Sequence, residues 1–250
     1  MKAVILAAGY GTRLLKDLEN VNEQRLKDLI GTPKPLLTVG GFPLISYWME
    51  ALKADHDLKD IHIVTNDLYY SKFEEWAKNY PFVTVISDGT STNENRLGAV
   101  SCLQLIIETF QIDDSIIVIG GDTLFYEDFH LQDVLKRYEV LHKDNKHANL
   151  VLSYICKDED TKKYGILEAD ESYRVRAIKE KPKAMDTASR QADAPVDEKD
   201  APGHYLSWLV ARKPVYFYSI SGRFDIGNLE SYLLCDKYFQ EKMNKLNYLQ

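Results

Sequence analysis

The stretch Ala3-Val4-Ile5-Leu6-Ala7-Ala8-Gly9-Tyr10-Gly11-Thr12-Arg13 decides how this chain is expected to fold. Its first four residues form a short apolar run, which is typical of a buried strand. The small residues and two glycines that follow predict a tight turn, because glycine adopts backbone angles that are closed to other residues. Such a turn lets the backbone approach a phosphate closely. Taken alone, the turn leaves two other interpretations open. It could be a purely structural turn, or it could open a dinucleotide site, although the third glycine of the dinucleotide fingerprint is missing.

From this first strand onward, strand and helix patterns alternate four times up to about residue 145. The expected elements follow one another at residues 3–6, 44–52, 61–64, 73–77, 83–86, 97–107, 116–119 and 129–141. Parallel strands need crossover connections, so this alternation predicts a parallel sheet with helices on both faces. The predicted fold class is α/β, a Rossmann-like three-layer α/β/α fold with a mostly parallel central sheet. Sheets of this kind bind ligands beyond the carboxyl ends of their strands.

Beyond residue 145 the pattern changes to strands with few helices between them, which predicts a mixed extension of the sheet. Residues 183–203 are rich in Asp, Ala, Lys and Pro without an apolar period, so we expect a loop or a disordered stretch there. The other expected elements are strands at 149–155, 166–168, 175–178 and 215–218, and helices at 205–210 and 229–239. We interpret residues 1–250 as a single domain with two halves, 1–145 and 146–250, divided where the pattern changes.

Composition narrows the classes of function. The 250 residues are 45% hydrophobic and 28% charged, which is typical of a globular protein, and the net charge is −7. That charge favours neither nucleic acid nor an anionic membrane, so phosphate binding must come from a few placed cations. The chain opens without a signal peptide or a membrane-length apolar run, which predicts a cytoplasmic location. The three cysteines are far apart, which argues against a zinc site.

The segment Thr32-Pro33-Lys34-Pro35-Leu36 encloses one lysine between two prolines. Proline fixes its own backbone angle, so the backbone around Lys34 is expected to be stiff. This indicates a lysine that is held for a purpose, and the alternative is an exposed lysine in a proline-rich loop.

The residue 3–14 stretch followed by Pro33-Lys34-Pro35-Leu36 resembles the sugar-1-phosphate nucleotidyltransferases, the sugar-nucleotide pyrophosphorylases related to glucose-1-phosphate thymidylyltransferase. Further matching blocks lie at residues 120–122, 164–166, 180–182 and 223–227, so the resemblance covers nearly the whole chain. It implies a GT-A-like nucleotidyltransferase fold, in which residues 1–145 form a nucleotide-binding half and residues 146–250 a sugar-binding half. It also implies a reaction in which a nucleoside triphosphate (NTP) and a sugar 1-phosphate give an NDP-sugar and pyrophosphate. Relatives often self-associate, so a homo-oligomer is left open.

The resemblance also implies a role for each matching residue, with Mg²⁺ as cofactor. The expected catalytic residues are Arg13, Lys34 and Asp122, and the expected metal ligands are Asp122 and Asp225. The residues expected to bind the nucleotide are Leu6, Ala8, Gly9, Gly11, Thr12, Arg13, Asn95 and Gly98. The residues expected to bind the sugar phosphate are Gly165, Glu180 and Lys181.

Plainer interpretations stand beside these roles. Asp122 could cap a turn, Glu180 and Lys181 could be an exposed charge pair, and Asp225 could cap the helix that starts near Asn228. The base is open, because residues 93–99 match neither the thymidylyl nor the uridylyl pattern. They are closer to the choline-phosphate cytidylyltransferase-like and heptose-phosphate branch.

The chain departs from the family pattern in two places. Residues 16–30 are an insertion between Arg13 and Lys34, either a lid over the nucleotide or a tolerated surface insertion. Residues 183–203 stand where the family has a strand–helix unit of the sugar pocket. One alternative function is therefore a catalytically weak regulatory subunit that binds a nucleotide or a sugar nucleotide. Another is a cytidylyltransferase acting on a non-sugar alcohol phosphate such as choline phosphate. A glycosyltransferase is disfavoured, because no Asp-x-Asp motif follows the fourth strand.

Overall fold

A computed structural model describes residues 1–55, 58, 60–126, 128–180 and 202–248. The chain divides into two compact units. The first comprises Met1–Leu97, Ser101–Phe125 and Arg223–Gln250, and the second comprises Gly98–Val100 and Tyr126–Gly222. The C-terminal helix thus belongs to the same unit as the N-terminal strand. The interpretation as one domain with halves at 1–145 and 146–250 stays a prediction.

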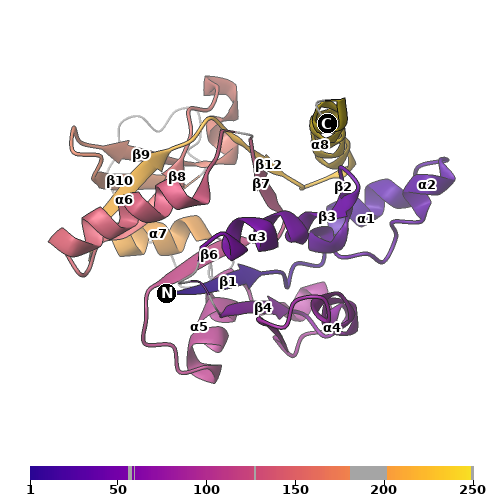
Figure 1. Cartoon of the computed structure of the whole chain (residues 1–250), viewed down its shortest axis with the longest axis horizontal. Coiled ribbons are helices and arrows are strands. Elements are labelled where there is room, and N and C mark those ends of the chain that lie inside the picture. The colour runs from indigo at the N-terminus through magenta and orange to yellow at the C-terminus, as the bar shows by residue number, and fades with distance from the viewer. Residues whose placement is uncertain (56–57, 59, 127, 181–201, 249–250) are drawn as a thin grey trace. The chain divides into compact units, whose positions relative to one another are not determined.

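The central sheet of the first unit has four parallel strands within its described residues, in the order β5-β4-β1-β6. Figure 1 shows β1 between β4 and β6. These strands are β1 (Lys2–Leu6), β4 (Ile61–Thr65), β5 (Val83–Ser87) and β6 (Ile116–Gly120). Leu6 pairs with Val64 on one side and with Gly120 on the other, so three carboxyl ends meet at one edge. The strand order reverses between β1 and β6, and such a switch point is where open α/β sheets bind ligands.

Both faces of this sheet are covered, because side chains alternate between faces along each strand. On one face α5 (Ala99–Thr109) packs its Ile106 against Val4 of β1. Ile5, one residue further along, points to the opposite face and is fully buried, and α3 (Leu44–Lys53) lies on that side (Figure 1). The predicted α/β fold class with a parallel central sheet is therefore confirmed.

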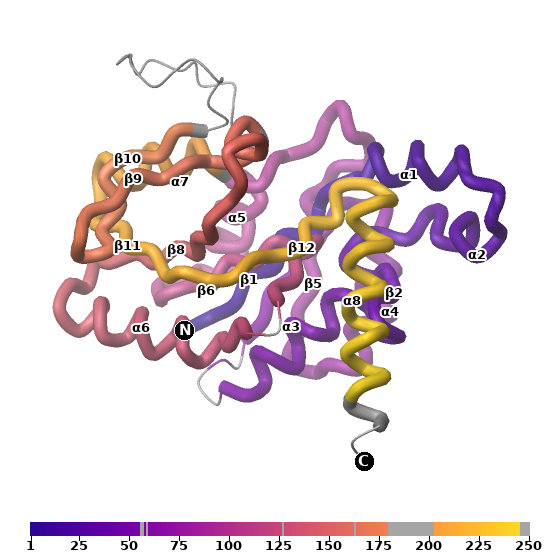
Figure 2. The backbone as a smooth tube through the Cα atoms, turned by 90° about the horizontal axis from the view of Figure 1, so that it is seen from above, coloured from indigo at the N-terminus to yellow at the C-terminus, as the bar shows by residue number. Residues whose placement is uncertain are grey.

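The remaining elements of the first unit bring its C-terminal segment back to the sheet. They are α1 (Thr12–Glu19), α2 (Gln24–Lys27), η1 (Lys34–Leu36), β2 (Thr38–Val39), β3 (Phe42–Pro43), α4 (Tyr70–Ala77), η2 (Asn93–Asn95), β7 (Thr123–Phe125), β12 (Arg223–Asp225) and α8 (Leu229–Tyr248). β12 pairs antiparallel with β7, and α8 lies beside β2 (Figure 2). Residues more than 200 positions apart in sequence thus share one unit.

The second unit combines parallel and antiparallel pairs, as the sequence predicts for this part of the chain. Its elements are α6 (Leu131–Asp144), β8 (Asn149–Ser153), η3 (Asp158–Lys163), β9 (Gly165–Ala169), β10 (Val175–Glu180), α7 (Pro202–Val210) and β11 (Val215–Ser219). β8 pairs parallel with β11, and β9 pairs antiparallel with β10. Val175, Leu209 and Val215 form the buried centre of this unit.

The predicted elements appear with shifts of a few residues at their ends. The helix expected at 97–107 begins at Ala99, because Gly98 has a positive φ of 89° that a helix does not use. The closing helix extends beyond the expected residue 239 to Tyr248. Most of the predicted irregular stretch 183–203, and with it the apparent loss of a strand–helix unit, lies outside the described residues, while residues 202 and 203 begin α7 instead.

Two negative findings concern the described residues alone. None of their helices is both long and apolar enough to cross a membrane. Cys102, Cys156 and Cys235 form no disulfide with one another, and Cys102 and Cys235 are buried.

Candidate active site

The glycine-rich turn connects β1 to α1 at the carboxyl edge of the sheet. Gly11 has φ 63°, in the left-handed region, and directly precedes Thr12, the first residue of α1. The first N–H groups of a helix have no partner within the helix and carry the positive end of its dipole. A turn of this kind is suited to an anion such as a phosphate. Leu6, Ala8, Gly9, Gly11, Thr12 and Arg13 lie in this turn or next to it, and their contact with a nucleotide stays a prediction.

Two strand ends are fastened to each other at this point. The backbone N–H of Gly121 donates to the carbonyl of Leu6 at 2.9 Å. A methyl group added to Gly121 would lie 2.9 Å from that same carbonyl oxygen and 2.9 Å from Cγ of Pro35, so the position requires glycine. The tight contact places Asp122 directly beside the turn that follows β1.

Lys34 reaches across the turn to Asp122. A methyl group added to Gly11 would lie 3.7 Å from Cγ and Cε of Lys34, so the lysine chain runs alongside the turn. Nζ of Lys34 lies 3.3 Å from Oδ2 of Asp122, and the two side chains are 18% and 38% exposed. The proline-flanked lysine is therefore partly shielded and paired, rather than an exposed lysine in a loop.

Asp225 joins this group from the C-terminal end of β12. It stands opposite Thr123 in the pairing of β12 with β7, and the N–H of Ile226 donates to the carbonyl of Asp122 at 3.0 Å. Partial burial raises the pKa of Asp225, and the carboxylate of Asp122 raises it further. The positive charges of Arg223, Lys34 and Arg13 oppose that rise. Arg13, Lys34 and Asp122 thus lie close enough to Asp225 to act on it electrostatically.

The plainer interpretation of Asp225 as a helix cap is not supported. α8 begins at Leu229, and Oδ1 of Asn228 accepts the N–H of Ser231 at 2.9 Å, as an N-cap residue does. The N–H of Leu229 donates to Asp17 at 3.1 Å. Asn228 and Asp17 therefore serve the start of the helix, and Asp225 remains at the site.

The chemistry of these two carboxylates is compatible with a divalent cation as ligand partner. The described residues contain no cluster of three or more His, Cys, Asp or Glu side chains that could hold a metal. Mg²⁺ is usually bound through one or two carboxylates, with phosphate oxygens and waters filling its other positions. Asp122 and Asp225 supply two carboxylates, and their mutual repulsion, which raises the pKa of Asp225, would be relieved by a cation.

The sequence did not predict the side chain of Asn66, which holds the glycine-rich turn through a hydrogen bond. Asn66 is fully buried, and its Nδ2 donates to the carbonyl of Ala8 at 3.0 Å. Its Oδ1 accepts the N–H of Tyr69 at 3.1 Å. An asparagine just after the strand at 61–64 was the available signal, since polar residues at a sheet's carboxyl edge meet there.

Asn95 and Gly98 lie near the start of α5, where the family resemblance places base recognition. Oδ1 of Asn95 accepts the N–H and the hydroxyl of Thr92, each at 3.1 Å, which closes the short helix η2. The side-chain amide oxygen of Asn95 is therefore already hydrogen-bonded to Thr92. A role for either residue in reading the base stays a prediction.

The expected sugar-phosphate residues belong to the second unit. Gly165 and Glu180 stand opposite each other in the antiparallel pair of β9 and β10, so their backbones are brought together. The side chain of Glu180 and the whole of Lys181 lie outside the described residues. Contact of these residues with a sugar phosphate stays a prediction.

The insertion at 16–30 is fastened to α8. Asp17 accepts the N–H of Leu229, and Arg25 pairs with the buried Asp236 at 3.3 Å. Leu18 and Leu29 of the insertion also line a narrow pocket together with Gly9, Gly11 and Lys34. The insertion thus forms one wall beside the glycine-rich turn.

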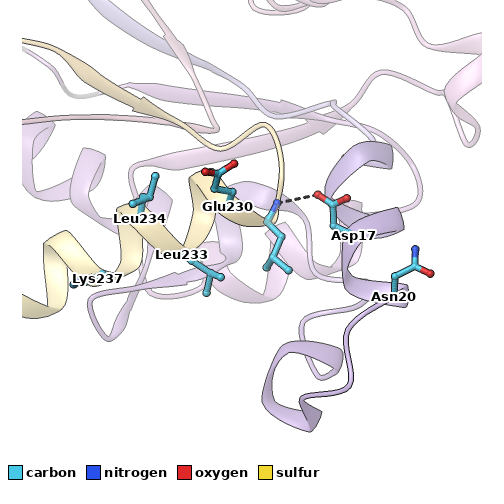
Figure 3. Close-up of a pocket in the computed structure, with 7 residues that line it drawn as sticks. Asp17, Asn20, Glu230, Leu233, Leu234 and Lys237 are labelled. Atoms are coloured by element: carbon cyan, nitrogen blue, oxygen red, sulfur yellow. Dashed lines mark hydrogen bonds between the residues drawn. The ribbon is translucent and has the colours of Figure 1, made fainter.

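A wider groove lies between α1 and α8 (Figure 3). Its lining residues are Asp17, Asn20, Leu229, Glu230, Leu233, Leu234 and Lys237. Three of these seven residues are leucines, two are carboxylates and one, Lys237, is a cation, whereas a triphosphate requires several closely placed donors and cations. The charged group around Lys34 is therefore the better candidate for the chemistry.

Comparisons with known proteins identify the family to which this chain is similar. The family model described as nucleotidyl transferase matches residues 2–219. A mannose-1-phosphate guanyltransferase from Candida albicans is 29% identical, over 68% of this chain and 41% of its own length. A glucose-1-phosphate thymidylyltransferase from Neisseria meningitidis is 27% identical, over 73% of this chain and 56% of its own length. The chain spans less than half the length of the first curated relatives it matches.

A solved structure shares the fold. The crystal structure of an apo UDP-glucose pyrophosphorylase superposes with a TM-score of 0.72, covering 97% of this chain and 98% of that one, at 19% identity.

Proposed function

Because the chain belongs to the nucleotidyl transferase family, we propose that it is an enzyme that makes an NDP-sugar and pyrophosphate from an NTP and a sugar 1-phosphate. The observation that carries this proposal is the ion pair of Lys34 with Asp122, which lies beside Asp225 and the glycine-rich turn at the switch point of the sheet. The relatives named above are themselves described as transferases of this kind.

In the proposed reaction an oxygen of the sugar phosphate attacks the α-phosphorus of the NTP. The bond between that phosphorus and the oxygen bridging to the β-phosphate breaks, and pyrophosphate leaves with the electron pair. Both reactants are anions, so the protein must position them and offset their charge, and it needs no covalent nucleophile. The turn at residues 9–13 would hold the triphosphate with its backbone N–H groups. Arg13 and Lys34 would offset the charge that develops on the phosphate oxygens.

Asp122 and Asp225 would hold Mg²⁺, which when bound supplies positive charge to the phosphate oxygens and helps orient them. The Lys34–Asp122 pair would keep the Asp122 carboxylate in place before the nucleotide arrives. Arg223, 3.2 Å from Asp225, would do the same for that carboxylate.

The remaining parts of the proposal rest on the family resemblance. Gly165, Glu180 and Lys181 would contact the sugar phosphate, and Asn95 and Gly98 would lie near the base. The protein would work in the cytoplasm, without nucleic acid or membrane partners, as a monomer or a homo-oligomer.

The test is a matrix of reactions with Mg²⁺. Each of ATP, CTP, GTP, UTP and dTTP is combined with glucose 1-phosphate, mannose 1-phosphate or choline phosphate. Pyrophosphate release is followed by a coupled assay, and the nucleotide product is identified by mass spectrometry. We expect one NTP and one sugar phosphate to give equal amounts of NDP-sugar and pyrophosphate. If only choline phosphate is turned over, the acceptor is an alcohol phosphate and not a sugar 1-phosphate. A lack of pyrophosphate in every reaction would contradict the proposal.

A further inference from the structure

The phenol of Tyr10 ties the glycine-rich turn to the loop that follows β5. Tyr10 lies between the two glycines of the turn, yet it is only 8% exposed. Its hydroxyl oxygen lies 2.8 Å from Oγ1 of Thr90, a residue 80 positions away that is 7% exposed. Because both partners are buried, losing this hydrogen bond would leave a polar group without a ready replacement from water.

The direction of this hydrogen bond follows from Asp88. The Thr90 hydroxyl donates to Oδ1 of Asp88 at 2.7 Å, and the Thr90 N–H donates to the same oxygen at 2.8 Å. A threonine hydroxyl has a single hydrogen, so Oγ1 of Thr90 accepts from Tyr10. The result is an ordered chain from the Tyr10 hydroxyl through Thr90 to a carboxylate. Burial raises the pKa of Tyr10, and the charge of Asp88 adds to it, so Tyr10 stays a donor at neutral pH.

The chain ends in the loop that leads to η2. The carbonyl of Thr90 accepts the N–H of Asp67 at 2.8 Å, which fixes this loop to the end of β4. Two residues further on, Thr92 begins the turn that Asn95 closes. The Tyr10–Thr90 bond therefore joins the turn expected to hold the triphosphate to the segment expected to lie near the base.

We propose that Tyr10, Thr90 and Asp88 are positioning residues that hold the glycine-rich turn in its nucleotide-binding conformation. This inference rests on the proposed function, because it assigns the turn to the NTP. A turn freed from this tether would have to be ordered when the nucleotide binds, and that cost lowers affinity. Lys34, Asp122 and Asp225 are held by separate contacts, so the loss falls on the Kd and KM for the NTP more than on kcat.

The test compares the variants Tyr10→Phe, Thr90→Val and the double variant with the wild type. Calorimetry measures the Kd for ATP, CTP, GTP, UTP and dTTP in the presence of Mg²⁺. We expect each single variant to weaken binding of the preferred NTP by roughly threefold to tenfold, the usual effect of one hydrogen bond. The double variant should bind the NTP no more weakly than the single variants, because all three lack the Tyr10–Thr90 hydrogen bond. Thr90→Ser keeps the hydroxyl and should restore binding.

Tyr47→Phe is the matched control, because the Tyr47 hydroxyl donates to the carbonyl of Val39 at 2.8 Å, in a different contact. This variant should leave the NTP Kd unchanged. The inference is overturned if Tyr10→Phe or Thr90→Val binds as the wild type does, if Thr90→Ser fails to rescue, or if Tyr47→Phe weakens binding equally. Wild-type protein that binds an NTP without turnover counts against the proposed function but leaves this inference standing. Wild-type protein that binds no NTP overturns both.

Discussion

Nζ of Lys34 and Oδ2 of Asp122 lie 3.3 Å apart, although 88 positions separate these residues in the chain. Pro33 and Pro35 enclose the lysine, and Asp122 follows the strand β6 that pairs with β1. The pair lies beside Gly11, so its two charges stand next to a helix N-terminus that favours anions. In the proposed reaction, Lys34 would serve a phosphate and Asp122 would serve its metal ion.

Replacing Lys34 by alanine should lower kcat by about 100-fold or more, because one preorganised positive group at the reacting phosphates is lost. The melting temperature should change little, since partly exposed ion pairs contribute only about 0–1 kcal/mol to stability. Initial rates of pyrophosphate release and a thermal melt measure the two effects. Lys78→Ala is the control, because Lys78 pairs with Glu75 on the exposed side of α4. A variant that retains full turnover would remove Lys34 from the mechanism.

Replacing Asp225 by asparagine should separate activity from stability. The folded state raises the pKa of this carboxyl, so at neutral pH its ionised form is less favourable in the folded chain than in the unfolded chain. The neutral amide removes that penalty, and the free energy of unfolding near pH 7 should stay the same or increase. Half-maximal activity should require more Mg²⁺, because one carboxylate ligand is gone. For the wild type, we expect activity to fall as the pH drops through this raised pKa.

Urea denaturation and Mg²⁺ titration of activity give the two readouts for Asp225→Asn. Asp113→Asn is the control, since Asp113 is an exposed aspartate of the same unit. A clear loss of stability in Asp225→Asn, or an unchanged requirement for Mg²⁺, would contradict this account.

His62 should make the fold sensitive to mild acid. Its side chain is 6% exposed, its ring is stacked on Phe110 at 4.1 Å, and neither ring nitrogen has a hydrogen-bond partner within the described residues. Burial lowers its pKa, as does the charge of Lys2, while Asp60 opposes the shift. In the unfolded chain the imidazole binds a proton near pH 6.5. Its contribution to stability is therefore full above that pH and is lost as the pH falls from there toward the lower folded-state pKa.

The measurement for His62 is the denaturation midpoint in urea between about pH 7 and about pH 5, the range in which histidine titrates. His62→Phe keeps a ring against Phe110 and cannot be protonated, so its midpoint should fall less than that of the wild type. His147→Gln alters an exposed histidine and should behave as the wild type does. Equal pH dependence in His62→Phe and in the wild type would rule out this role.

Two glycine-to-alanine changes should affect different properties, one the affinity for the NTP and the other the stability of the fold. A methyl group on Gly9 meets nothing within 4 Å, so Gly9→Ala should fold with an unchanged melting temperature but bind the NTP less tightly, because the methyl obstructs close approach of the phosphates. A methyl group on Gly121 overlaps the carbonyl of Leu6, so Gly121→Ala should lose about 1–3 kcal/mol of stability. Thermal melts and NTP calorimetry on both variants distinguish the two effects. The assignment of Gly9 to the nucleotide fails if Gly9→Ala binds the NTP normally.

The sequence by itself determined the elements and the class of the fold. Apolar runs such as Val4 to Leu6, separated by helical periods, lead to a buried parallel sheet because only that arrangement removes the side chains on both faces from water. The glycine-rich turn and Lys34 could be recognised from their immediate neighbours, because an apolar run precedes the glycines and a proline stands on each side of Lys34.

Only the tertiary structure decided which polar residues meet. Asp225 reaches Asp122 because β12 pairs with β7, and Tyr10 reaches Thr90 because β5 joins the sheet two strands away from β1. Neither contact follows from periodicity, because strand order depends on how the whole chain packs and not on the local pattern of apolar residues. Asn66 was missed for the same reason, since its importance lies in a partner, Ala8, that is 58 positions away.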